Sequence, residues 1–545
     1  MQHSCTQADS SYREQGTLLF RRAGFIALSL ALTIAMPAVL AAQADWPQFG
    51  QNNANTADNQ NESTISPDTA PKLKPKWKFS AKGDVSARAA VVDGVVYFPD
   101  WGGWLWALNA ASGKVIWSKQ LSSYSLANPS SGKPLTTVVS RNTPAVADGV
   151  LYLGTIEGGW FLAINAKTGA LLWKERPEAD DSAQLTGSPA YAAGLVYVGV
   201  TSNEEGVTGN KPRTARGSVV ALEASSGHVQ WQTYMTVAGY SGVGVWGSNP
   251  VVDESRGSVF VGTGDNYEEP TDPSYLSCIQ TGGKPSTCQS PQNFVDSVVA
   301  LDMYSGKVKW AQKLVTWPEE KSQSGADMFN LSCIHQGDSG CPSPEGPDFD
   351  FGSAPNEIAY ANNQGSGTIL GIGQKSGIYY ALDPDNGNLV WQKQVGPGSR
   401  SGGILWGSAA DKTRIYVAIG NPFGASYGST KKALGTAGTW AAINPADGKI
   451  LWQVPDPSGA IDIGAMTVAN GVVYAPSTAH GSSDPTMIAL DAAHGNTLWK
   501  YAGGASTIAG ATVVNGMVYW GSGYSRLGSP YTGNHMLYAF SIDGK

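Results

Sequence analysis

The sequence has little charge, little histidine and few cysteines. Asp, Glu, Lys and Arg make up 14% of the 545 residues, and there are six histidines and five cysteines. The formal net charge of −7 provides no basic face, so binding to nucleic acid is not expected. The scattered histidines form no Ser-His-Asp pattern, and covalent haem is not expected because the chain lacks a C-x-x-C-H motif.

Long apolar runs are also absent, except for one near the N-terminus. Arg21 and Arg22 precede the stretch GFIALSLALTIAMPAVL, and Ala42-Gln43-Ala44 is a small-x-small cleavage site. This pattern predicts a signal peptide over residues 1–44 and a mature chain over 45–545, periplasmic or secreted. A membrane anchor is the alternative interpretation, and the export route stays open. Without a second apolar segment, no stable membrane anchor is expected after cleavage.

The few cysteines fit an oxidising compartment. Cys5 would leave with the signal peptide, and the remaining four allow three disulfide pairings. Both close pairs lie in short loops rich in Gly, Pro and Ser, which favours Cys278 with Cys288 and Cys333 with Cys341. Zinc is a poor alternative, since His335 is the one histidine near them.

Glycine and tryptophan, in contrast, are abundant, with 67 and 18 residues. Eight of the tryptophans each close an expected strand, and seven follow a Gly-containing turn, as in ALNAASGKVIW and ALDPDNGNLVW. A self-similar unit recurring along the chain indicates a repeat architecture. The eight are Trp77, Trp117, Trp173, Trp231, Trp310, Trp391, Trp452 and Trp499.

A second pair of strands precedes most of these units. Runs such as VVDGVVYFPD and VANGVVYAPS each read as two strands about a Gly turn, so every unit becomes a four-stranded antiparallel sheet. Such repeats predict an all-β, eight-bladed β-propeller forming a single domain over residues 45–545. The last copy ends before its Trp strand, and the isolated strand around Trp77 is expected to complete it. Closing the ring leaves no exposed sheet edge.

Unequal spacing points to the functional face. The longest intervals between successive repeat tryptophans, 79 and 81 residues, fall in blades four and five, where all four mature cysteines lie. Loops of this length, at roughly 266–294 and 317–347, are expected to build a rim or lid over one mouth of the ring.

Acidic residues stand beside these insertions, at the ends of inner strands. Strands of adjacent blades converge on the axis, where grouped carboxylates repel each other unless a cation neutralises them. Oxygen ligands without His or Cys suit a hard ion such as calcium. These positions are Glu204 and Glu205 in blade three, Asp265 and Asn266 in blade four, and Asp348 and Asp350 in blade five.

With its A-x-D-x-x-x-G-x-x-x-W repeats, the chain resembles the eight-bladed quinoprotein alcohol dehydrogenases, which hold pyrroloquinoline quinone (PQQ) and calcium on the propeller axis. The resemblance covers nearly all of the mature chain. Within this family, the segments WPQFGQNNANT at Trp46 and GTGDNY at Gly262 look most like the polyvinyl alcohol dehydrogenase branch.

The resemblance implies a set of metal ligands. VGVTSNE matches the strand that ends in the family's metal-binding glutamate, which gives that role, and contact with the cofactor, to Glu204. GTGD stands where the family has GTGN, so Asp265 would bind the metal, with Asn266 as an alternative ligand. Asp350 is also counted among the metal ligands.

The resemblance also implies cofactor and catalytic residues. VWGS makes Trp246 the platform beneath the quinone, and VVSRN makes Arg141 a clamp on a cofactor carboxylate. GQKSGIYYALD places Lys375 beside the quinone oxygens. The general base would be Asp350 by its aromatic neighbours or Asp348 by its distance to Pro355, with Asp350 favoured.

The function implied is oxidation of an alcohol, secondary or polymeric in the polyvinyl alcohol dehydrogenase manner. Electrons would pass to an external acceptor, a cytochrome c or a quinone, because the chain has no haem segment. The family's adjacent cysteines above the quinone are replaced by Leu135 and Thr136. The alternative is a non-enzymatic propeller of the bacterial envelope that binds partner proteins as a scaffold.

Overall fold

The computed structural model describes residues 45–247, 249–314, 326–334, 338–343, 345–428 and 434–545. The signal peptide predicted over residues 1–44 lies outside these residues, as does part of the insertion at 317–347. Among the residues described, no helix is both long and apolar enough to cross a membrane.

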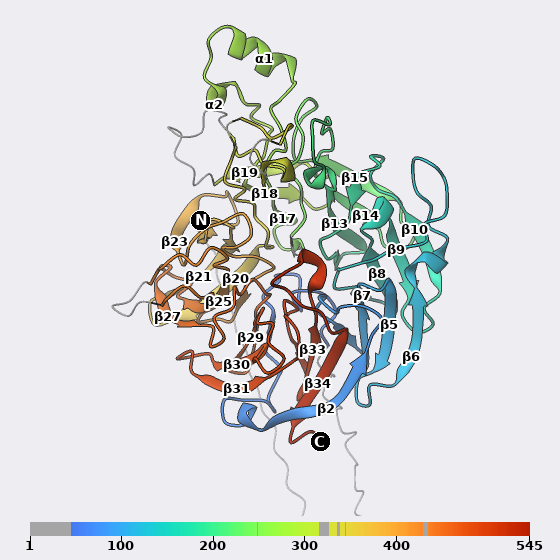
Figure 1. Ribbon diagram of the computed structural model, residues 1–545, viewed down its shortest axis with the longest axis vertical. Coiled ribbons are helices and arrows are strands. Elements are labelled where there is room, and N and C mark those ends of the chain that lie inside the picture. Colours follow the sequence, from blue (N-terminus) through green and yellow to red (C-terminus); the bar gives the residue numbers. More distant parts are fainter. Residues whose placement is uncertain (1–44, 248, 315–325, 335–337, 344, 429–433) are drawn as a thin grey trace, which may run out of the picture. The chain divides into compact units, whose positions relative to one another are not determined.

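Eight antiparallel sheets surround a common axis, as the sequence predicted (Figure 1). Blades one to four comprise β3 (Ala90–Val92), β4 (Val95–Pro99), β5 (Trp104–Asn109) and β6 (Val115–Gln120); β7 (Ala145–Ala147), β8 (Val150–Gly154), β9 (Phe161–Asn165) and β10 (Leu171–Glu175); β12 (Ala190–Ala192), β13 (Leu195–Ser202), β14 (Ser218–Glu223) and β15 (Val229–Tyr234), with β11 (Ala183–Gln184) added beside β13; and β16 (Val251–Asp253), β17 (Ser258–Gly262), β18 (Ser297–Asp302) and β19 (Val308–Lys313).

Blades five to eight repeat this order. They comprise β20 (Asn356–Asn362), β21 (Gly365–Gly373), β22 (Ile378–Leu382) and β23 (Leu389–Gln394); β24 (Ala409–Ala410), β25 (Ile415–Ile419), β26 (Thr439–Ile443) and β27 (Ile450–Pro455); β28 (Thr467–Ala469), β29 (Val472–Pro476), β30 (Met487–Asp491) and β31 (Thr497–Tyr501), with β1 (Asp58–Asn59) beside β28; and β32 (Thr512–Val514), β33 (Met517–Ser522), β34 (Met536–Ile542) and β2 (Leu73–Ser80).

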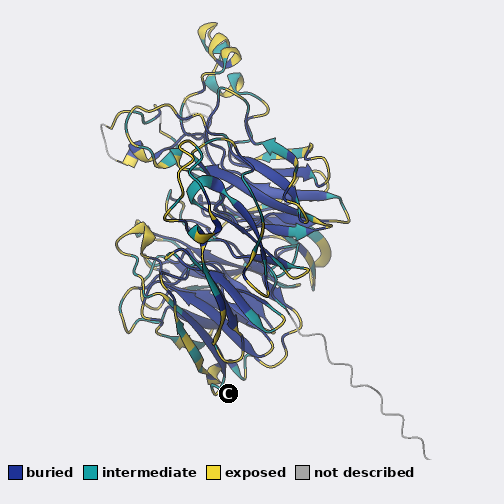
Figure 2. Cartoon of the chain, turned by 90° about the vertical axis from the view of Figure 1, so that its right-hand side faces the viewer, coloured by how far each residue is buried: buried dark blue, intermediate teal, exposed yellow. Residues whose placement is uncertain are grey.

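The N-terminal strand closes the ring. Strand β2 pairs antiparallel with β34, with Trp77 opposite Ala539, so the first strand of the propeller completes the last blade. This confirms the predicted closure. The inner strands are mostly buried, whereas exposed residues gather in the connecting loops and turns (Figure 2).

Each repeat tryptophan docks its blade onto the next. The eight indole N–H groups donate hydrogen bonds of 2.8–3.2 Å to backbone carbonyls, from Trp117 to Ala166 and onward to Trp499, which donates to Leu73. In seven blades the ring also lies over the turn glycine of the neighbouring blade, as Trp173 lies over Gly227. The repeated Trp and Gly are therefore two halves of one contact between blades.

A second device ties the blades together at the axis. The segment from Trp46 to Asn59, here called the axial segment, hydrogen-bonds with the inner strand of every blade. Because its partners include the first and the last blade, it can seat fully only when the ring is closed. The partners, in order, are Val91, Val146, Tyr191, Val252, Glu357, Ala410, Val468 and Val513.

Short helices occupy the connections. They are α1 (Pro273–Gln280), α2 (Pro285–Cys288), and the 3-10 turns η1 (Ala70–Lys72), η2 (Leu121–Tyr124), η3 (Glu157–Gly159), η4 (Glu204–Gly206), η5 (Leu331–Ile334) and η6 (Ser525–Leu527).

The two insertions are stapled as predicted. Disulfides join Cys278 to Cys288 and Cys333 to Cys341. The first insertion carries α1 and α2, which project outward beyond blade four in Figure 1 and do not lie across the ring. The described part of the second insertion instead packs on blade three, where Arg213 donates to the Gly340 carbonyl. The expected rim or lid is therefore not formed by α1 and α2.

We expect Gly227→Ala to destabilise the protein more than Gly194→Ala in the same blade. Both glycines have positive φ, 79° and 77°, so each substitution incurs about 1–2 kcal/mol of backbone strain. A Cβ at Gly227 would lie 2.6 Å from the Trp173 ring, whereas nothing lies within 4 Å of one at Gly194. Overpacking should add about 1–3 kcal/mol at Gly227 alone. Denaturant unfolding measures both; equal losses would show that the Trp–Gly contact does not control stability.

Candidate active site on the propeller axis

A cavity of about 40 Å³ lies on the axis. The segments that lead into the inner strands form its wall, and Phe49 of the axial segment also lines it. Two residues with guanidinium groups and five with hydroxyl groups line the cavity together with apolar side chains. These polar residues are Ser86, Arg88, Arg141, Thr143, Thr186, Ser188 and Tyr524.

Three buried carboxylates meet beside Trp246, which stands just before Gly247 of the cavity wall. Asp265 follows β17, and Asp348 and Asp350 precede β20, so neighbouring blades four and five supply them. One carboxylate oxygen from each lies within 4.8 Å of the others. All three residues are buried, as the convergence of strand ends on the axis predicted.

Lys375 partly neutralises this group. Its ammonium donates to Asp348 Oδ1 at 2.5 Å and to Asp350 Oδ2 at 3.0 Å. Burial alone would lower the pKa of Lys375, but the charges of Asp348, Asp350 and Glu205 raise it well above its ordinary value. Lys375 therefore carries a fixed positive charge between two carboxylates.

One lysine leaves the group short of positive charge. Burial, followed by repulsion from Asp350 and Asp348, raises the pKa of Asp265 well above its ordinary range. Burial likewise raises the pKa of Asp348, although Lys375 opposes the shift. The Oδ2 atom of Asp265 has no hydrogen-bond partner among the described residues. These carboxylates accordingly favour a proton or an additional cation.

Asp350 is held by three donors. Its Oδ1 accepts from the Asp265 backbone N–H at 2.7 Å, and its Oδ2 accepts from Lys375 and from the Trp246 indole at 2.9 Å. These bonds fix the carboxylate against the edge of Trp246. They also give Asp350 a more defined orientation than Asp348, whose only side-chain bond among the described contacts is to Lys375.

Trp246 and Arg141 lie side by side at the cavity. Arg141 donates to the carbonyls of Trp246 and Thr186, each at 3.3 Å, and its guanidinium lies 6.0 Å from the Trp246 ring centre. On the other side, the Lys375 ammonium lies 5.2 Å from the same ring. Burial lowers the pKa of Arg141. Cationic groups thus approach this indole from blades two and five.

Not every predicted ligand joins the cluster. The Glu204 carboxylate accepts from the backbone N–H groups of Thr214 and Ala215, at 2.6 and 2.7 Å. Its neighbour Glu205 turns toward the axis, where burial and then the charge of Asp350 raise its pKa to about 7, with Lys375 opposing. The structure therefore brings Glu205, and not Glu204, into electrostatic contact with Lys375 and Asp350.

Asn266 also points elsewhere. Its amide N donates to the Ser241 carbonyl at 2.8 Å, and its amide O accepts from Asn293 at 2.8 Å. Both ends of the side chain hold the loop of blade four in place. Asp265, its neighbour, is the residue of the GTGDN segment that reaches the cluster.

Two further residues of the site, Trp406 and Asp327, were not predicted from the sequence. Trp406 lies edge to face with Trp246, with ring centres 5.7 Å apart, and the Arg141 guanidinium lies 4.7 Å from its centre. Asp327 accepts from the backbone N–H groups of Asp348 and Phe349, and burial raises its pKa to about 6. The LWGS segment ending at Ser408 repeats VWGS at Trp246 and could have indicated Trp406, whereas nothing around Asp327 in the sequence indicates its place.

The backbone is strained at two of these positions. Asp348 and Trp406 have φ of 57° and 55°, in the left-handed region that non-glycine residues rarely adopt. Strain of this kind persists where the surroundings impose it and is frequent at functional sites. Here it turns both side chains toward the axis.

The residues present suit both an anionic quinone and a hard cation. Thr143 Oγ1 and Arg88 Nε, both at the cavity, have no hydrogen-bond partner among the described residues, and neither arginine of the cavity is paired with a carboxylate there. Buried cations that lack a carboxylate counterion favour a bound anion. The oxygen-only set around Asp265 suits calcium.

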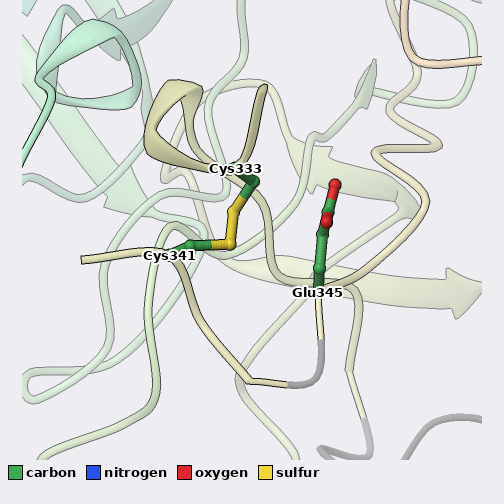
Figure 3. A group of neighbouring side chains, drawn as sticks. All are labelled: Cys333, Cys341 and Glu345. Carbon is green, nitrogen blue, oxygen red and sulfur yellow. A yellow bond between two sulfur atoms is a disulfide. The ribbon is translucent and has the colours of Figure 1, made fainter. Parts of the chain in front are cut away.

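A second group of possible ligands, on the insertion of blade five, has a different explanation. Cys333, Cys341 and Glu345 lie close together, but the two sulfur atoms are joined in a disulfide (Figure 3). Disulfide sulfur is not the thiolate that binds metals. We therefore interpret this group as a structural staple.

We expect Lys375→Met to destabilise the calcium-free protein strongly. Removing one partner of a buried ion pair costs about 3–5 kcal/mol, because the remaining charges stay buried. Added calcium should recover part of the loss. Denaturant unfolding with calcium and with a chelator measures both effects, and Lys307→Met, at an exposed turn of blade four, is the matched control. Equal stability of the two variants would contradict the ion-pair interpretation.

Comparisons with known proteins identify relatives of this chain. A family model described as outer membrane protein assembly factor BamB matches residues 72–284 and 374–529. The polyvinylalcohol dehydrogenase of a Pseudomonas species is 30% identical over 93% of this chain and 79% of its own length. That of Sphingopyxis sp. (strain 113P3) is also 30% identical, over 87% and 73%.

Solved structures share the fold. The quinohemoprotein alcohol dehydrogenase of Comamonas testosteroni superposes with a TM-score of 0.65 at 18% identity, covering 92% of this chain and 81% of that chain. With an eight-bladed ring and relatives that match over most of both lengths, the chain belongs to the quinoprotein alcohol dehydrogenase family, with polyvinyl alcohol dehydrogenases among its relatives, and is an alcohol-oxidising enzyme.

Proposed function

We propose that this enzyme oxidises an alcohol with PQQ and calcium in the periplasm and passes the electrons to an external acceptor. The observation that carries the proposal is the Asp348–Lys375–Asp350 ion-pair group beside Trp246 and Arg141. It joins a base, a fixed cation and an aromatic platform at one place on the axis.

The cofactor would lie between the arginine side of the cavity and the acids. Arg141 is placed to bind a carboxylate of the quinone, and Thr143 and Thr186 offer hydroxyl groups in the same wall. Trp246 offers the ring on which a planar quinone can stack. Asp265, Glu205 and Asp350 would hold the calcium ion, with Glu205 in the place that the sequence assigned to Glu204.

When bound, PQQ supplies the two-electron acceptor and calcium supplies a Lewis acid. The chain supplies the proton chemistry. Asp350 is held by Trp246, Lys375 and the Asp265 backbone, which orients its carboxylate to take the hydroxyl proton of the alcohol as general base. Lys375 keeps a positive charge where negative charge develops during oxidation.

The substrate follows from the relatives. Two of them are named polyvinylalcohol dehydrogenases, which favours a secondary or polymeric alcohol for this chain. A cytochrome c or a quinone is the expected electron acceptor. The described part of the chain has four cysteines, and all four are in disulfides, so none of them is a free thiol.

The scaffold alternative rests on the family model, whose description names an outer membrane assembly factor. A scaffold that acts only through its surface has no use for buried carboxylates around a lysine. Buried ion pairs usually bring little stability over apolar packing, so their presence on the axis supports chemistry there.

Reconstitution tests the function. Purified protein is mixed with PQQ and calcium, and dye reduction is measured with primary, secondary and polymeric alcohols. At saturating PQQ and calcium we expect Asp350→Asn to lose most turnover, because general-base catalysis contributes about 10²–10⁴-fold. Asp348→Asn should retain more activity. The reverse order would move the base to Asp348, and absence of both PQQ binding and activity would exclude the dehydrogenase proposal.

The adjacent glutamates provide a matched pair for the metal site. Glu205→Gln should weaken calcium-dependent PQQ binding, because it removes a carboxylate from the axial group. Glu204→Gln should leave that binding nearly unchanged, since Glu204 only holds backbone amides. Titration calorimetry with calcium, with and without PQQ, measures both. A larger effect at Glu204 would restore the assignment made from the sequence.

A further inference from the structure

A chain of aromatic rings leads from the cavity to the surface between blades eight and one. Trp246 contacts Trp406 at 5.7 Å between ring centres, and Trp406 contacts Tyr524 at 6.5 Å. Tyr524, only 2% exposed, contacts Trp101 at 6.5 Å and Tyr531 at 6.0 Å. Both of these last rings are partly exposed.

The chain starts at the proposed cofactor site. Trp406 and Tyr524 line the cavity itself. The Trp101 indole donates to Ser86 Oγ at 2.7 Å, and Ser86 lines the cavity as well. Trp101 therefore connects the cavity wall to the outer surface through one side chain.

The surface around Trp101 is apolar and cationic. Leu527 is 54% exposed, and the Arg526 guanidinium lies 5.6 Å from the Trp101 ring centre. Lys82 is also exposed, and its backbone packs against Gly102 beside Trp101. Neither Arg526 nor Lys82 forms an ion pair within the part of the chain that the structure describes.

The carboxylates of Asp84 and Asp100 do not face solvent at this surface, although Asp84 Oδ1 has no hydrogen-bond partner among the described residues. Asp84 and Asp100 are buried beneath it, where Asp84 accepts from Ser525 and Asp100 accepts from Trp106 and from backbone N–H groups. What faces solvent on a chain of net charge −7 is thus a small positive, apolar patch. We call the set Lys82, Trp101, Arg526, Leu527 and Tyr531 the exit patch.

We propose that the exit patch is the docking surface for a c-type haem protein with an acidic rim around its exposed haem edge, and that the aromatic chain carries electrons to it. Apolar contact at the centre and opposite charges at the rim are the usual construction of such an interface. The proposal rests on the proposed function, because the electrons come from the reduced cofactor.

The redox balance needs only this partner. Oxidation of one reduced quinone would release two electrons and two protons: two ferric haems each take one electron and become ferrous, and the two protons pass to solvent. The two oxidations are sequential, so the haem protein docks, leaves and is replaced. A transient interface with a small apolar centre suits that turnover.

Binding to the protein without cofactor tests the patch separately from catalysis. An acidic c-type cytochrome and a basic one serve as probes, with affinities and association rates measured at low and high salt. The acidic probe should bind more tightly, and the double variant Lys82→Glu with Arg526→Glu should slow its association about tenfold or more at low salt. Lys114→Glu with Lys449→Glu is the matched control, because both lysines are exposed and lie outside the exit patch, in the β5–β6 turn of blade one and the β26–β27 turn of blade six.

Several results would overturn the proposal. These are absence of binding by the acidic probe, tighter binding of the basic probe, or an equal effect of the control variant. Reduction of a soluble quinone analogue by a protein that binds no cytochrome would assign the acceptor role to quinone instead. If the protein neither binds PQQ nor reduces a small dye, the proposed function is wrong. The cytochrome affinities would still test the exit patch in that case.

The aromatic chain has its own test in the reconstituted enzyme. Trp101→Leu should slow electron transfer to bound cytochrome, whereas Trp101→Phe should retain more of the rate because it keeps a ring in place. Because Trp101 also belongs to the exit patch, the rates are compared at saturating cytochrome, where weaker docking does not limit them, and the rate with a small dye measures the preceding chemistry. Equal electron-transfer rates in Trp101→Leu and the unmodified enzyme would exclude this route.

Discussion

The structure depends on one repeated contact, the indole of each blade resting on the turn of the next. Eight hydrogen bonds from tryptophan to backbone carbonyl link the blades in a closed circle, and the last of them reaches Leu73 of the N-terminal strand. Because every blade meets its neighbour in the same way, the inner strands converge on one axis. The axial segment then binds all eight inner strands. The residues of a functional site on the axis are therefore held in position by these rigid inner strands.

The same regularity explains what the sequence could and could not predict. Trp, Gly and strand spacing recur, so the number of blades, the closure by β2 and both local disulfides followed from the chain alone. The orientation of adjacent side chains in a short turn does not recur: Glu204 and Glu205 share η4, and only the three-dimensional path of that turn decides which one faces Lys375. Asp327 lies in a non-repeating insertion, where no pattern indicates position.

The buried charges on the axis destabilise the fold, and apolar packing elsewhere offsets this loss of stability. Asp265, Asp348, Asp350 and Glu205 face one lysine, and burial opposes the charged form of each shifted carboxyl. Elsewhere the inner strands are apolar, and neighbouring blades are stabilised by the packing between them and by the indole contact. Destabilising interactions at functional sites are tolerated when the surrounding structure imposes them. The strained backbone at Asp348 and Trp406 belongs to the same balance.

The site is also asymmetric, because its acid–base groups and its aromatic chain lie on different blades. The carboxylates and Lys375 come from blades three to five, whereas the aromatic chain leaves between blades eight and one. In a ring of eight blades the junction of four with five lies opposite the junction of eight with one. Trp246 stands between the two halves, since its indole N–H binds Asp350 and its ring contacts Trp406. An alcohol deprotonated on the acidic side would thus leave the opposite wall free for an acceptor, so that substrate and redox partner would approach opposite sides of the ring.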